Sequence, residues 1–313
     1  LHKMIISADQ LNINMNRKFI YFINPISGTG KKVLLLEIIK KETELKNIPF
    51  EILHTNAAGE YEYLKEKIAT EDITDVIVCG GDGTVNQVAA ALLGTDVNIG
   101  IVPMGSGNGL AFAAKIPKQI QKALKIIFAG NASFIDSFYI NNKFSCMLCG
   151  LGFDAQVAHD FARQQKRGLA TYVKQSTKNF FTAKPYPFEL NIDGNIITTE
   201  AFFISIANSN QFGNNFTIAP KASLHDGLLD IVVVNKMSKM RMIWTVMKQI
   251  RNGQVRMYED KKYHRNDIHY FQTKKLSIKN PGAAPLHIDG DPAVTASTFE
   301  IEIIEKAFKL LMP

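Results

Sequence analysis

Disulfide frameworks, membrane spans and leader segments all lack support in this 313-residue sequence. Only three cysteines are present, too few to staple a small secreted domain, which favours a reducing compartment such as the cytoplasm. No run of about 18 or more uncharged apolar residues occurs, so no transmembrane helix is predicted. The first residues also lack the apolar core and small-residue cleavage site of a secretory signal.

Metal-binding and nucleic-acid motifs are missing as well. The seven histidines are scattered and form no H-E-x-x-H. Cys146 and Cys149 form a C-x-x-C, but KFSCMLCGLGF reads as one strand, in which this spacing puts the two side chains on opposite faces. We therefore interpret them as buried thiols and not as a redox or metal pair. No zinc-finger spacing, ribonucleoprotein motif or basic-aromatic stripe supports binding to nucleic acid.

Acidic residues are outnumbered by basic ones, and the formal net charge is +7. This balance suits an anionic partner, whether a nucleotide, a nucleic acid or an acidic membrane surface, and does not choose among them. Apolar residues make up 46% of the chain, which allows a sizeable core and argues against global disorder. The length accommodates two domains of ordinary size.

Strands and helices alternate in the first part of the chain. This alternation, with apolar strands, is typical of parallel βαβ units whose sheet is covered on both faces. Ligands of such sheets bind beyond the carboxyl ends of the strands. The predicted strands are KFIYFINP, PFEILHT, DVIVCGG and NIGIVP, and the predicted helices are residues 31–46, residues 60–69 and GTVNQVAAALL.

The pattern changes after about residue 130. Residues 133–153, residues 187–234 and the chain from 268 onward read mainly as strands, with helical stretches near 154–182 and 238–251. In LNIDGNIITTEAFFISIAN, Asp193-Gly194 predicts the turn of a hairpin. The second part is therefore predicted to be a mainly antiparallel β domain, a sandwich.

Four segments describe the predicted organisation. The strand-like STFEIEII near the end either closes the β domain or returns to the first domain. The chain begins with Leu1 and not with methionine. Its first ~15 residues are therefore interpreted either as an artificial addition to the protein or as the result of a wrongly assigned start, for which Met4 and Met15 are the candidates. The segments are 1–16 (extension), 17–132 (nucleotide-binding α/β domain), 133–298 (β-sandwich) and 299–313 (C-terminal segment).

The stretch VIVCGGDGTVNQVAAAL leaves a predicted strand through glycines and enters a helix. Gly80, Gly81 and Gly83 allow the backbone to approach a ligand, and the helix N-terminus offers N–H groups and a positive dipole end to a phosphate. Asp82 would repel that phosphate unless a divalent cation lay between them. The stretch therefore reads as a Mg-nucleotide site. The alternative is a tight turn in which Asp82 caps the helix through the N–H groups of Thr84 and Val85.

Two more glycine-rich loops follow predicted strands. NPISGTGKK resembles a P-loop but has Pro25 and Lys32 where the motif needs glycine and a hydroxyl residue. Ser27, its glycines and Lys31 either hold phosphate or form a helix-capping loop. VPMGSGNGLA is neither G-x-S-x-G nor a dinucleotide fingerprint. Because three such loops end parallel strands of one sheet, they are expected to converge at one edge.

Five motifs, in order along the chain, resemble the diacylglycerol kinase catalytic-domain family, which includes sphingosine kinases and bacterial lipid kinases. The resemblance spans roughly residues 19–305. It implies an NAD-kinase-like α/β nucleotide-binding domain joined to a β-sandwich. The motifs are NPISGTGK, GGDGTVNQV, PMGSGN, APKASLHDGLLDIVVV and HIDGDP.

The resemblance implies ATP as the nucleotide and a lipid hydroxyl as the acceptor of its γ-phosphate. The family's usual Gly-Thr is Gly105-Ser106 here, which keeps the hydroxyl. The loops at 24–31, 80–86 and 105–108 are expected to hold the triphosphate, with Mg²⁺ near Asp82. The nucleotide-binding candidates are Asn24, Ser27, Lys31, Thr55, Gly80, Gly81, Asp82, Gly83, Thr84, Asn86, Gly105, Ser106 and Asn108.

Two further sites follow from the resemblance. Asp226, with the backbone carbonyls of Ser223 and Leu228, matches a structural Mg²⁺ site, for which a plain Asp-Gly turn is the alternative. Asp291 aligns with the family's catalytic glutamate but is one methylene shorter, so its reach to the acceptor hydroxyl needs a shift or a bridging water. Asp289 is its nearest rival as the base. Asp82 and Asp291 are thus the catalytic candidates.

The resemblance therefore implies an ATP-dependent lipid kinase, which we expect in the cytoplasm, peripheral at the inner face of the membrane. An NAD-kinase-like enzyme and a nucleotide- or lipid-binding pseudokinase are the alternatives. The acceptor lipid and the oligomeric state stay open, a homodimer being one option. Residues 235–251, with Trp244, and residues 168–182, with Tyr172, Phe180 and Phe181, either face a bilayer or pack on the sandwich.

Overall fold

The computed structural model describes residues 17–24, 32–56, 58–164, 179–180, 182–211, 219–238, 240–241 and 268–313, without the side chains of residues 32 and 33. The chain divides into two compact units. Unit 1 consists of Leu1–Ile135 and Ala307–Pro313, and unit 2 consists of Asp136–Lys306. The predicted segments 238–251 and 168–182 lie largely outside the described residues; within the second, Phe180 packs edge-on against Phe153, with ring centroids 6.3 Å apart.

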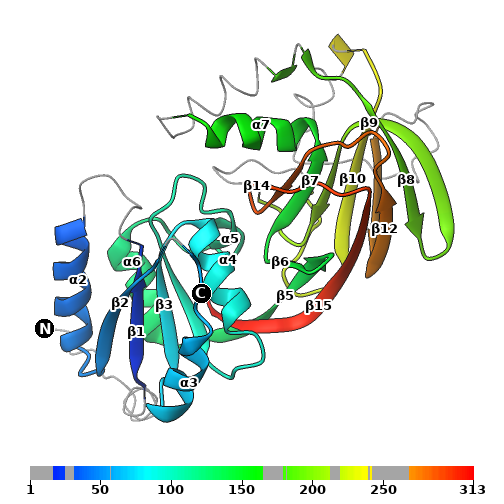
Figure 1. Cartoon of the computed structure of the whole chain (residues 1–313). Coiled ribbons are helices and arrows are strands. Elements are labelled where there is room, and N and C mark those ends of the chain that lie inside the picture. Colours follow the sequence, from blue (N-terminus) through cyan, green and yellow to red (C-terminus); the bar gives the residue numbers. More distant parts are fainter. Residues whose placement is uncertain are drawn as a thin grey trace, which may run out of the picture. The chain divides into compact units, whose positions relative to one another are not determined.

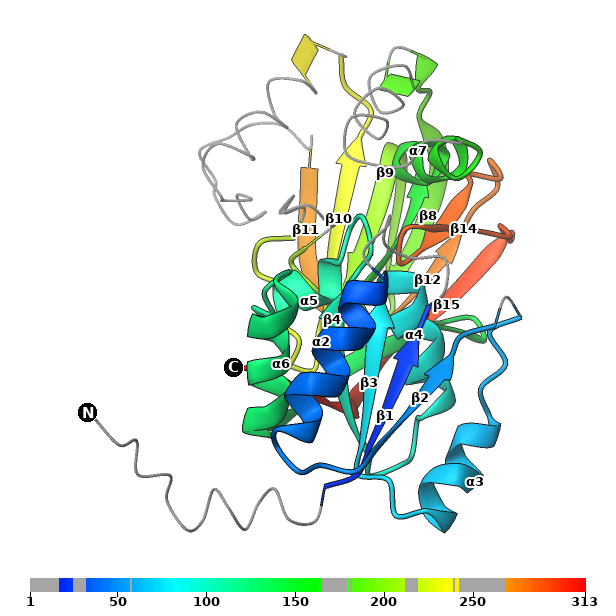
Figure 2. The same cartoon turned by 90° about the vertical axis from the view of Figure 1, so that its left-hand side faces the viewer.

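Unit 1 is built on a parallel sheet, as predicted, whose strands run in the order β4-β3-β1-β2. The final strand of the chain, β15 (Thr298–Leu311), adds to β4 in parallel through Lys309 and Leu310. Figure 2 shows this sheet with its helices. The elements are β1 (Phe19–Ile23), α2 (Lys32–Glu44), β2 (Phe50–His54), α3 (Tyr63–Thr70), β3 (Asp75–Gly80), α4 (Asp82–Ala91), β4 (Asn98–Pro103), α5 (Gly109–Ala113) and α6 (Ile120–Ala129).

Helices cover both faces of this sheet (Figure 1). On one face, α2 and α6 contribute Leu35 and Leu124 to a core with Phe19 and Tyr21 of β1. On the other face lie α3 and α4, and Phe22 packs edge-on against Tyr61 with ring centroids 4.8 Å apart. Every residue of β1 is buried, which explains why its sequence is continuously apolar instead of alternating.

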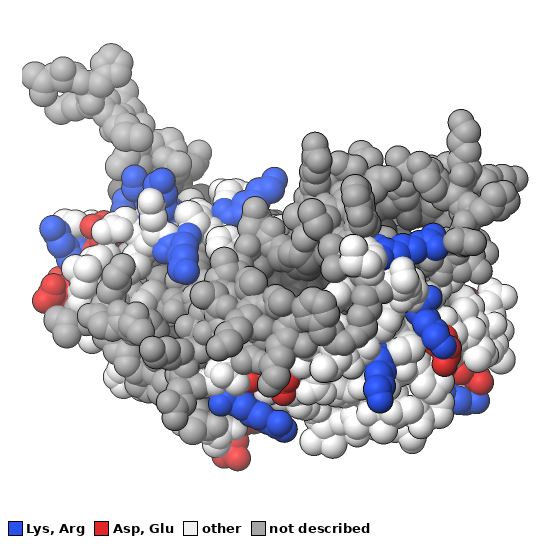
Figure 3. Space-filling view, turned by 90° about the horizontal axis from the view of Figure 1, so that it is seen from above, with Lys and Arg blue, Asp and Glu red and all other residues white. Residues whose placement is uncertain are grey.

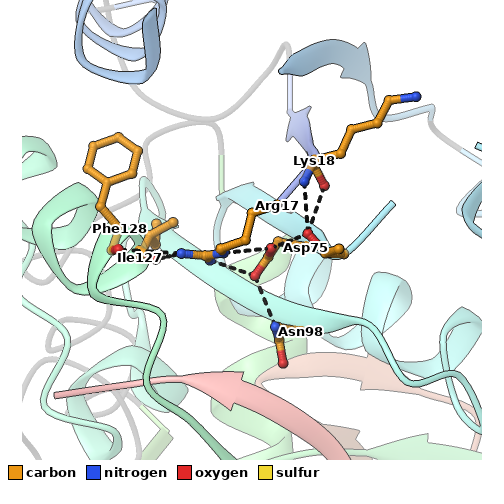
Figure 4. A network of polar contacts seen from close by, with 7 residues as sticks. Arg17, Lys18, Asp75, Asn98, Ile127 and Phe128 are labelled. Atoms are coloured by element: carbon orange, nitrogen blue, oxygen red, sulfur yellow. Dashed lines mark hydrogen bonds and ion pairs between the residues drawn. The ribbon is translucent and has the colours of Figure 1, made fainter. Parts of the chain in front are cut away.

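A buried ion pair closes the amino end of the sheet (Figure 4). Arg17 donates from Nε to Asp75 at 3.0 Å, from a terminal nitrogen to Asp75 at 2.6 Å, and from the other to the Ile127 carbonyl at 2.9 Å. Asn98 also donates to Asp75, at 3.1 Å. Both charged side chains are at least nine-tenths buried. The pair therefore joins the start of β1 to β3, β4 and the end of α6. It lies at the amino ends of the strands, and the glycine motifs follow their carboxyl ends.

Arg17→Met is expected to lower the free energy of unfolding by about 3–5 kcal/mol, because it leaves the Asp75 carboxylate buried without its partner. Urea unfolding of the variant tests this. The exposed Lys236–Glu200 pair, whose side chains are 60% and 55% exposed, offers a matched control: Lys236→Met should change stability little. An Arg17→Met effect as small as the control would contradict a stabilising role for the buried pair.

Unit 2 is mainly antiparallel β-structure, again as predicted. Its strands are paired in the order β14-β13-β7-β9-β8-β12-β15, with β10 between β9 and β11 and with β6 on β5. Buried side chains from these strands form one core, including Leu151, Ile204, Ile231 and Ile301. The elements are β5 (Ala132–Ile140), β6 (Lys143–Ser145), β7 (Leu148–Gly152), α7 (Phe153–Ala162), β8 (Tyr186–Ile192), β9 (Asn195–Ala207), β10 (Leu229–Asn235), β11 (Ile268–Thr273), β12 (Lys275–Lys279), β13 (Leu286–Ile288) and β14 (Asp291–Ala293).

Two hairpins of unit 2 turn through an Asp-Gly pair. In the predicted turn between β8 and β9, Asp193 and Gly194 have φ of 50° and 83°. Between β13 and β14, Asp289 and Gly290 have φ of 49° and 87°. Positive φ at both central positions defines the type I′ turn that suits the twist of a two-residue hairpin.

The prediction of one strand through KFSCMLCGLGF is wrong. The segment forms β6 and β7, separated by Cys146 and Met147. The break arises because the N–H groups of Cys146, Met147 and Leu148 all donate to the carboxylate of Asp289, at 3.0–3.1 Å. Cys146 and Cys149 are buried free thiols, as predicted, and Cys79 is a buried free thiol as well.

Among the helices that the structure describes, none combines the length and apolar character needed to span a membrane.

Candidate functional site

Backbone hydrogen bonds join the carboxyl ends of β1, β3 and β4 in unit 1. Asn24, after β1, donates its backbone N–H to the Cys79 carbonyl of β3 at 3.1 Å. Met104, after β4, donates its N–H to the Gly80 carbonyl at 2.9 Å. The Asn24 side chain also donates to the Thr84 hydroxyl at 2.9 Å. The loops that follow β1, β3 and β4 therefore begin next to one another, at the carboxyl ends of these parallel strands.

Glycine is required where the second and third loops touch. A Cβ on Gly105 would lie 2.6 Å from the Cα of Gly81, and a Cβ on Gly81 would lie 3.1 Å from the Cα of Gly105. Both contacts involve backbone, which cannot rotate away as a side chain would. The close approach of these two loops, and not a positive φ, is therefore the physical reason for this pair of glycines.

Asn108 closes the third loop on itself. Its side chain accepts from the Gly105 N–H at 2.8 Å and donates to the Gly105 carbonyl at 2.7 Å. It adopts the left-handed conformation, with φ of 55°, which asparagine tolerates better than most residues. Asn108 is 2% exposed, whereas Ser106 is exposed at the tip of the loop. The sequence marked Asn108 as a ligand contact, but its described bonds hold the loop that presents Ser106.

Asp82 connects two of the loops. Helix α4 begins with Gly81 as its N-cap residue, so Asp82 is the first residue of the helix and not the cap considered as the alternative. Its Oδ1 accepts from the Leu110 N–H of α5 at 3.4 Å, and a Cβ on Gly107 would lie 2.9 Å from its Oδ2. The half-buried carboxylate thus stands beside the N–H groups that open α4.

This arrangement fits a phosphate that is shielded by a divalent cation. The first N–H groups of α4 and the helix dipole favour an anion. A carboxylate at the same point is a hard oxygen ligand of the kind that Mg²⁺ accepts. Gly81 and Gly83, on either side of Asp82, are partly exposed and carry no side chain that would cover the backbone. The chemistry of the donor set therefore agrees with the group that the sequence motif implied.

The remaining nucleotide-binding candidates of unit 1 lie around this edge or outside the described residues. Thr55, after β2, donates its N–H to the Ile23 carbonyl at 3.0 Å and so adjoins the Asn24 strand end. Gly83 and Asn86 lie in the first turns of α4 and are partly exposed. Ser27 and Lys31 lie outside the described residues.

The loop at residues 219–228 of unit 2, which carries Asp226 and is called the Asp226 loop here, is organised by a buried aspartate that no sequence motif indicated. Asp136 accepts from the Gly227 N–H and from the Lys306 N–H, both at 2.8 Å. Asp226 itself is exposed and accepts from the Leu228 N–H at 3.2 Å; partial desolvation raises its pKa. The signal that could have found Asp136 is an acidic residue within the predicted strand FIDSF.

A cation at this loop would depend on carbonyl oxygens. No cluster of three or more His, Cys, Asp or Glu side chains suited to a metal occurs among the described residues. One carboxylate with the carbonyls of Ser223 and Leu228 is an all-oxygen set, which Mg²⁺ accepts when water completes its octahedral shell. The residues present thus fit the ion.

Asp230, the second aspartate of DGLLD, is fully buried. Desolvation raises its pKa to about 6, although its Oδ1 accepts from the Tyr270 hydroxyl and from Gln272. It faces away from the sandwich core, since its neighbours Leu229 and Ile231 point into that core.

Asp289 and Asp291 have very different surroundings. Asp291 opens β14 and is exposed. Asp289 is 7% exposed, and its carboxylate accepts from the Ser145 hydroxyl at 2.7 Å as well as from the N–H groups of Cys146, Met147 and Leu148. With the Cys146 thiol, which also donates to it at 3.6 Å, the carboxylate accepts five hydrogen bonds and holds this part of the structure together.

Comparison with protein families agrees with this two-part chain. The model of the diacylglycerol kinase catalytic domain matches residues 18–140. The model of the YegS C-terminal NAD kinase beta sandwich-like domain matches residues 148–312, more than half of the chain. The chain belongs to this lipid kinase family. The family resemblance found in the motifs is thereby confirmed.

Relatives and solved structures of the family align over most of this chain. A "Probable lipid kinase YegS-like" of Shewanella frigidimarina is 28% identical over 82% of this chain and 82% of its own length. A diacylglycerol kinase of Bacillus subtilis is 25% identical over 76% of this chain and 77% of its own length. The crystal structure of a diacylglycerol kinase from Bacillus anthracis superposes with a TM-score of 0.72 at 21% identity, covering 95% of this chain and 97% of the other, which shows the shared fold.

Proposed function

We propose that this protein is an ATP-dependent lipid kinase that transfers the γ-phosphate of ATP to a lipid hydroxyl, with a diacylglycerol-like acceptor. One observation carries the proposal: the loop 80–84 packs against the loop 105–108 through Gly81 and Gly105, with the Asp82 carboxylate at their junction. Family membership supports a kinase, and the names of the relatives support a lipid as its substrate.

Phosphoryl transfer asks the protein mainly for positioning and for neutralisation of charge. In this proposal the opening N–H groups of α4 bind phosphate oxygens, and Thr84 is oriented for the same site by the Asn24 side chain. The Ser106 hydroxyl, at the tip held by Asn108, donates to a neighbouring phosphate oxygen. Asp82 is the ligand for Mg²⁺, which when bound supplies charge neutralisation at the phosphates.

Asp291 is the proposed base for the acceptor hydroxyl. Its carboxylate is exposed on a tight hairpin, whereas the carboxylate of Asp289 already accepts five hydrogen bonds. A base needs a lone pair directed at the proton that it removes, and Asp289 has its oxygens directed at Ser145 and at the backbone. The surroundings of the two aspartates therefore favour Asp291.

A lipid acceptor places the protein at a membrane surface, and we propose the inner face of the cytoplasmic membrane. Figure 3 shows Lys and Arg side chains spread over one face without gathering into a single patch among the residues drawn in colour. Attraction to an anionic surface would on this basis be diffuse, in keeping with the net charge of +7. Trp244, the candidate anchor, lies outside the described residues.

Incubation with γ-labelled ATP, Mg²⁺ and fractionated membrane lipids tests the function, with the labelled product identified by mass. A phosphorylated lipid is the expected result, and its mass names the acceptor. Label that enters NAD in a parallel reaction would instead establish an NAD-kinase-like enzyme. Nucleotide binding without transfer to any fraction would establish a pseudokinase.

Gly105→Ala is expected to lower kcat/KM for ATP by about 10–100-fold, because its Cβ would push the loops at Gly81 and Gly105 apart. Steady-state kinetics at varied ATP measures the change. Gly194→Ala is the matched control: that glycine has φ of 83° but nothing within 4 Å of an added Cβ, so the change strains only its own turn in unit 2. Equal kcat/KM values in the two variants would contradict the role of the close approach.

A further inference from the structure

A buried histidine–carboxylate pair underlies the hairpin that carries Asp291. His287, on β13, is 0% exposed, and Asp154, in the first turn of α7, is 6% exposed. The Nε2 of His287 lies 3.4 Å from Oδ2 of Asp154. The two residues are 133 positions apart in the chain, and no sequence motif pointed to a role for either of them.

The hydrogen bonds of His287 define where its proton lies. Its Nδ1 accepts from the Gly290 N–H at 3.3 Å, so this nitrogen carries no proton. A neutral imidazole then has its proton on Nε2, which can donate to Asp154. Asp154 is itself fixed, because its Oδ1 accepts from the Ala155 N–H at 2.8 Å. The chain of bonds therefore runs from the start of α7 through the imidazole to the backbone of Gly290.

Gly150 makes room for this pair. A Cβ on Gly150 would lie 2.0 Å from Oδ2 of Asp154 and 2.6 Å from Nε2 of His287. No side chain larger than hydrogen fits between β7 and the pair without moving one partner. The glycine in the middle of a buried strand, a position that usually weakens a strand, thus has a packing reason.

The hairpin is held on its other side as well. Asp289, next to Gly290, accepts hydrogen bonds from the Ser145 hydroxyl, at the end of β6, and from three successive backbone N–H groups that lead into β7. His159 of α7 also bonds the Leu286 carbonyl of β13, at 2.8 Å. Asp291 follows directly after these anchored residues. Its backbone position is therefore determined by Asp289 on one side and by His287 on the other.

We propose that Asp154 and His287 form a positioning pair that fixes the Asp289–Gly290 turn and thereby aims Asp291 at the acceptor hydroxyl. The proposal rests on the kinase function and on Asp291 as the base. Asp154 selects the tautomer of His287, and His287 holds the N–H of the residue before Asp291. A displacement of about 1 Å at a reacting group can cost on the order of 100-fold in rate, so a fixed turn has a catalytic value.

Two substitutions at His287 separate its two hydrogen bonds. His287→Asn keeps an acceptor near the position of Nδ1, and His287→Gln keeps a polar group near the position of Nε2 but loses the acceptor for Gly290. We expect His287→Gln to lower kcat by about 10–100-fold with KM for ATP unchanged, and His287→Asn to retain most of kcat. His269→Gln on β11 controls for the loss of a partly buried histidine and should leave kcat unchanged.

Hydrogen exchange at the Gly290 amide gives a readout that does not depend on turnover. Its protection should persist in His287→Asn and fall in His287→Gln. If the wild type is active and His287→Gln keeps full kcat, the positioning role of the pair is wrong, while the kinase function still stands. Equal losses of kcat and of thermal stability in both His287 variants would reduce the pair to a structural contact. A wild type without phosphoryl transfer would reject the kinase function and the positioning role together.

Discussion

Asp82→Asn is expected to lower the rate of phosphoryl transfer by roughly a thousandfold while the protein remains folded. The carboxylate is the proposed ligand for a cation whose charge neutralisation contributes several kcal/mol, and each 1.36 kcal/mol of barrier is about tenfold in rate. Asparagine keeps an oxygen that can accept from the Leu110 N–H, so the junction of the two loops should survive. The neutral amide, however, is a weak ligand for a hard divalent cation.

The measurement compares initial rates over a range of Mg²⁺ concentrations for the wild type, Asp82→Asn and Asp96→Asn. Asp96 lies just before β4, at the amino end of that strand, and its side chain is 92% exposed. Its variant therefore controls for the loss of one negative charge in unit 1. Unfolding curves report whether each variant is folded. Near-normal turnover in Asp82→Asn would remove the carboxylate from the mechanism and with it the central argument for the site.

The second large effect is expected at Asp291. Asp291→Asn should lower kcat by about 10²–10⁴-fold, the usual contribution of a general base. Asp291→Glu should retain activity, because it restores the residue that the family motif carries and extends the carboxylate by one methylene. Pre-steady-state transfer to the lipid identified by mass would separate a slower chemical step from slower product release.

Asp193→Asn provides the control for Asp291. Asp193 lies in the other Asp-Gly hairpin of unit 2, and asparagine also suits its left-handed backbone, with φ of 50°. This variant should keep full activity. If Asp291→Ala turned over at the wild-type rate, Asp291 would be no base, and the search for the proton acceptor would move to another residue.

The sequence predicted the fold class because its strong signals are local. The apolar segment FIYFI has no polar alternation, and a strand that is buried on both faces needs none. Asp193-Gly194 predicted its hairpin because few residue pairs adopt positive φ twice in succession. The convergence of the glycine loops followed from the parallel topology alone, since neighbouring parallel strands end at one edge.

The bonds that arrange the candidate site are not local, and the sequence did not reveal them. The donors to Asp289 lie 141 to 144 residues away in the chain, and no spacing rule connects such positions. The same holds for Asp136, which organises the Asp226 loop from 91 residues away. The break at Cys146 was missed for this reason: a strand that reads as continuous is interrupted by a carboxylate from the far end of the chain.

The position of a residue at the candidate site does not by itself give it a role in binding a ligand. The structure places Asn24, Gly80 to Asn86 and Gly105 to Asn108 at one edge of a sheet, but contact of these residues with ATP stays a prediction. The same is true of Mg²⁺ at Asp82 and at the Asp226 loop. For Asn108 the two kinds of role compete, because both groups of its amide already bond Gly105. Its effect on a nucleotide would act through the shape of the loop.

The division of the chain into units has a consequence for its synthesis. Unit 1 is completed by residues 307–313, of which Leu310 and Leu311 are fully buried and Leu310 pairs beside β4. Until these residues emerge from the ribosome, β4 is an uncovered edge strand with a gap in the core next to it. Such an edge is where nascent chains associate wrongly. The nascent protein must therefore keep its first-made part soluble while all of unit 2 is being translated.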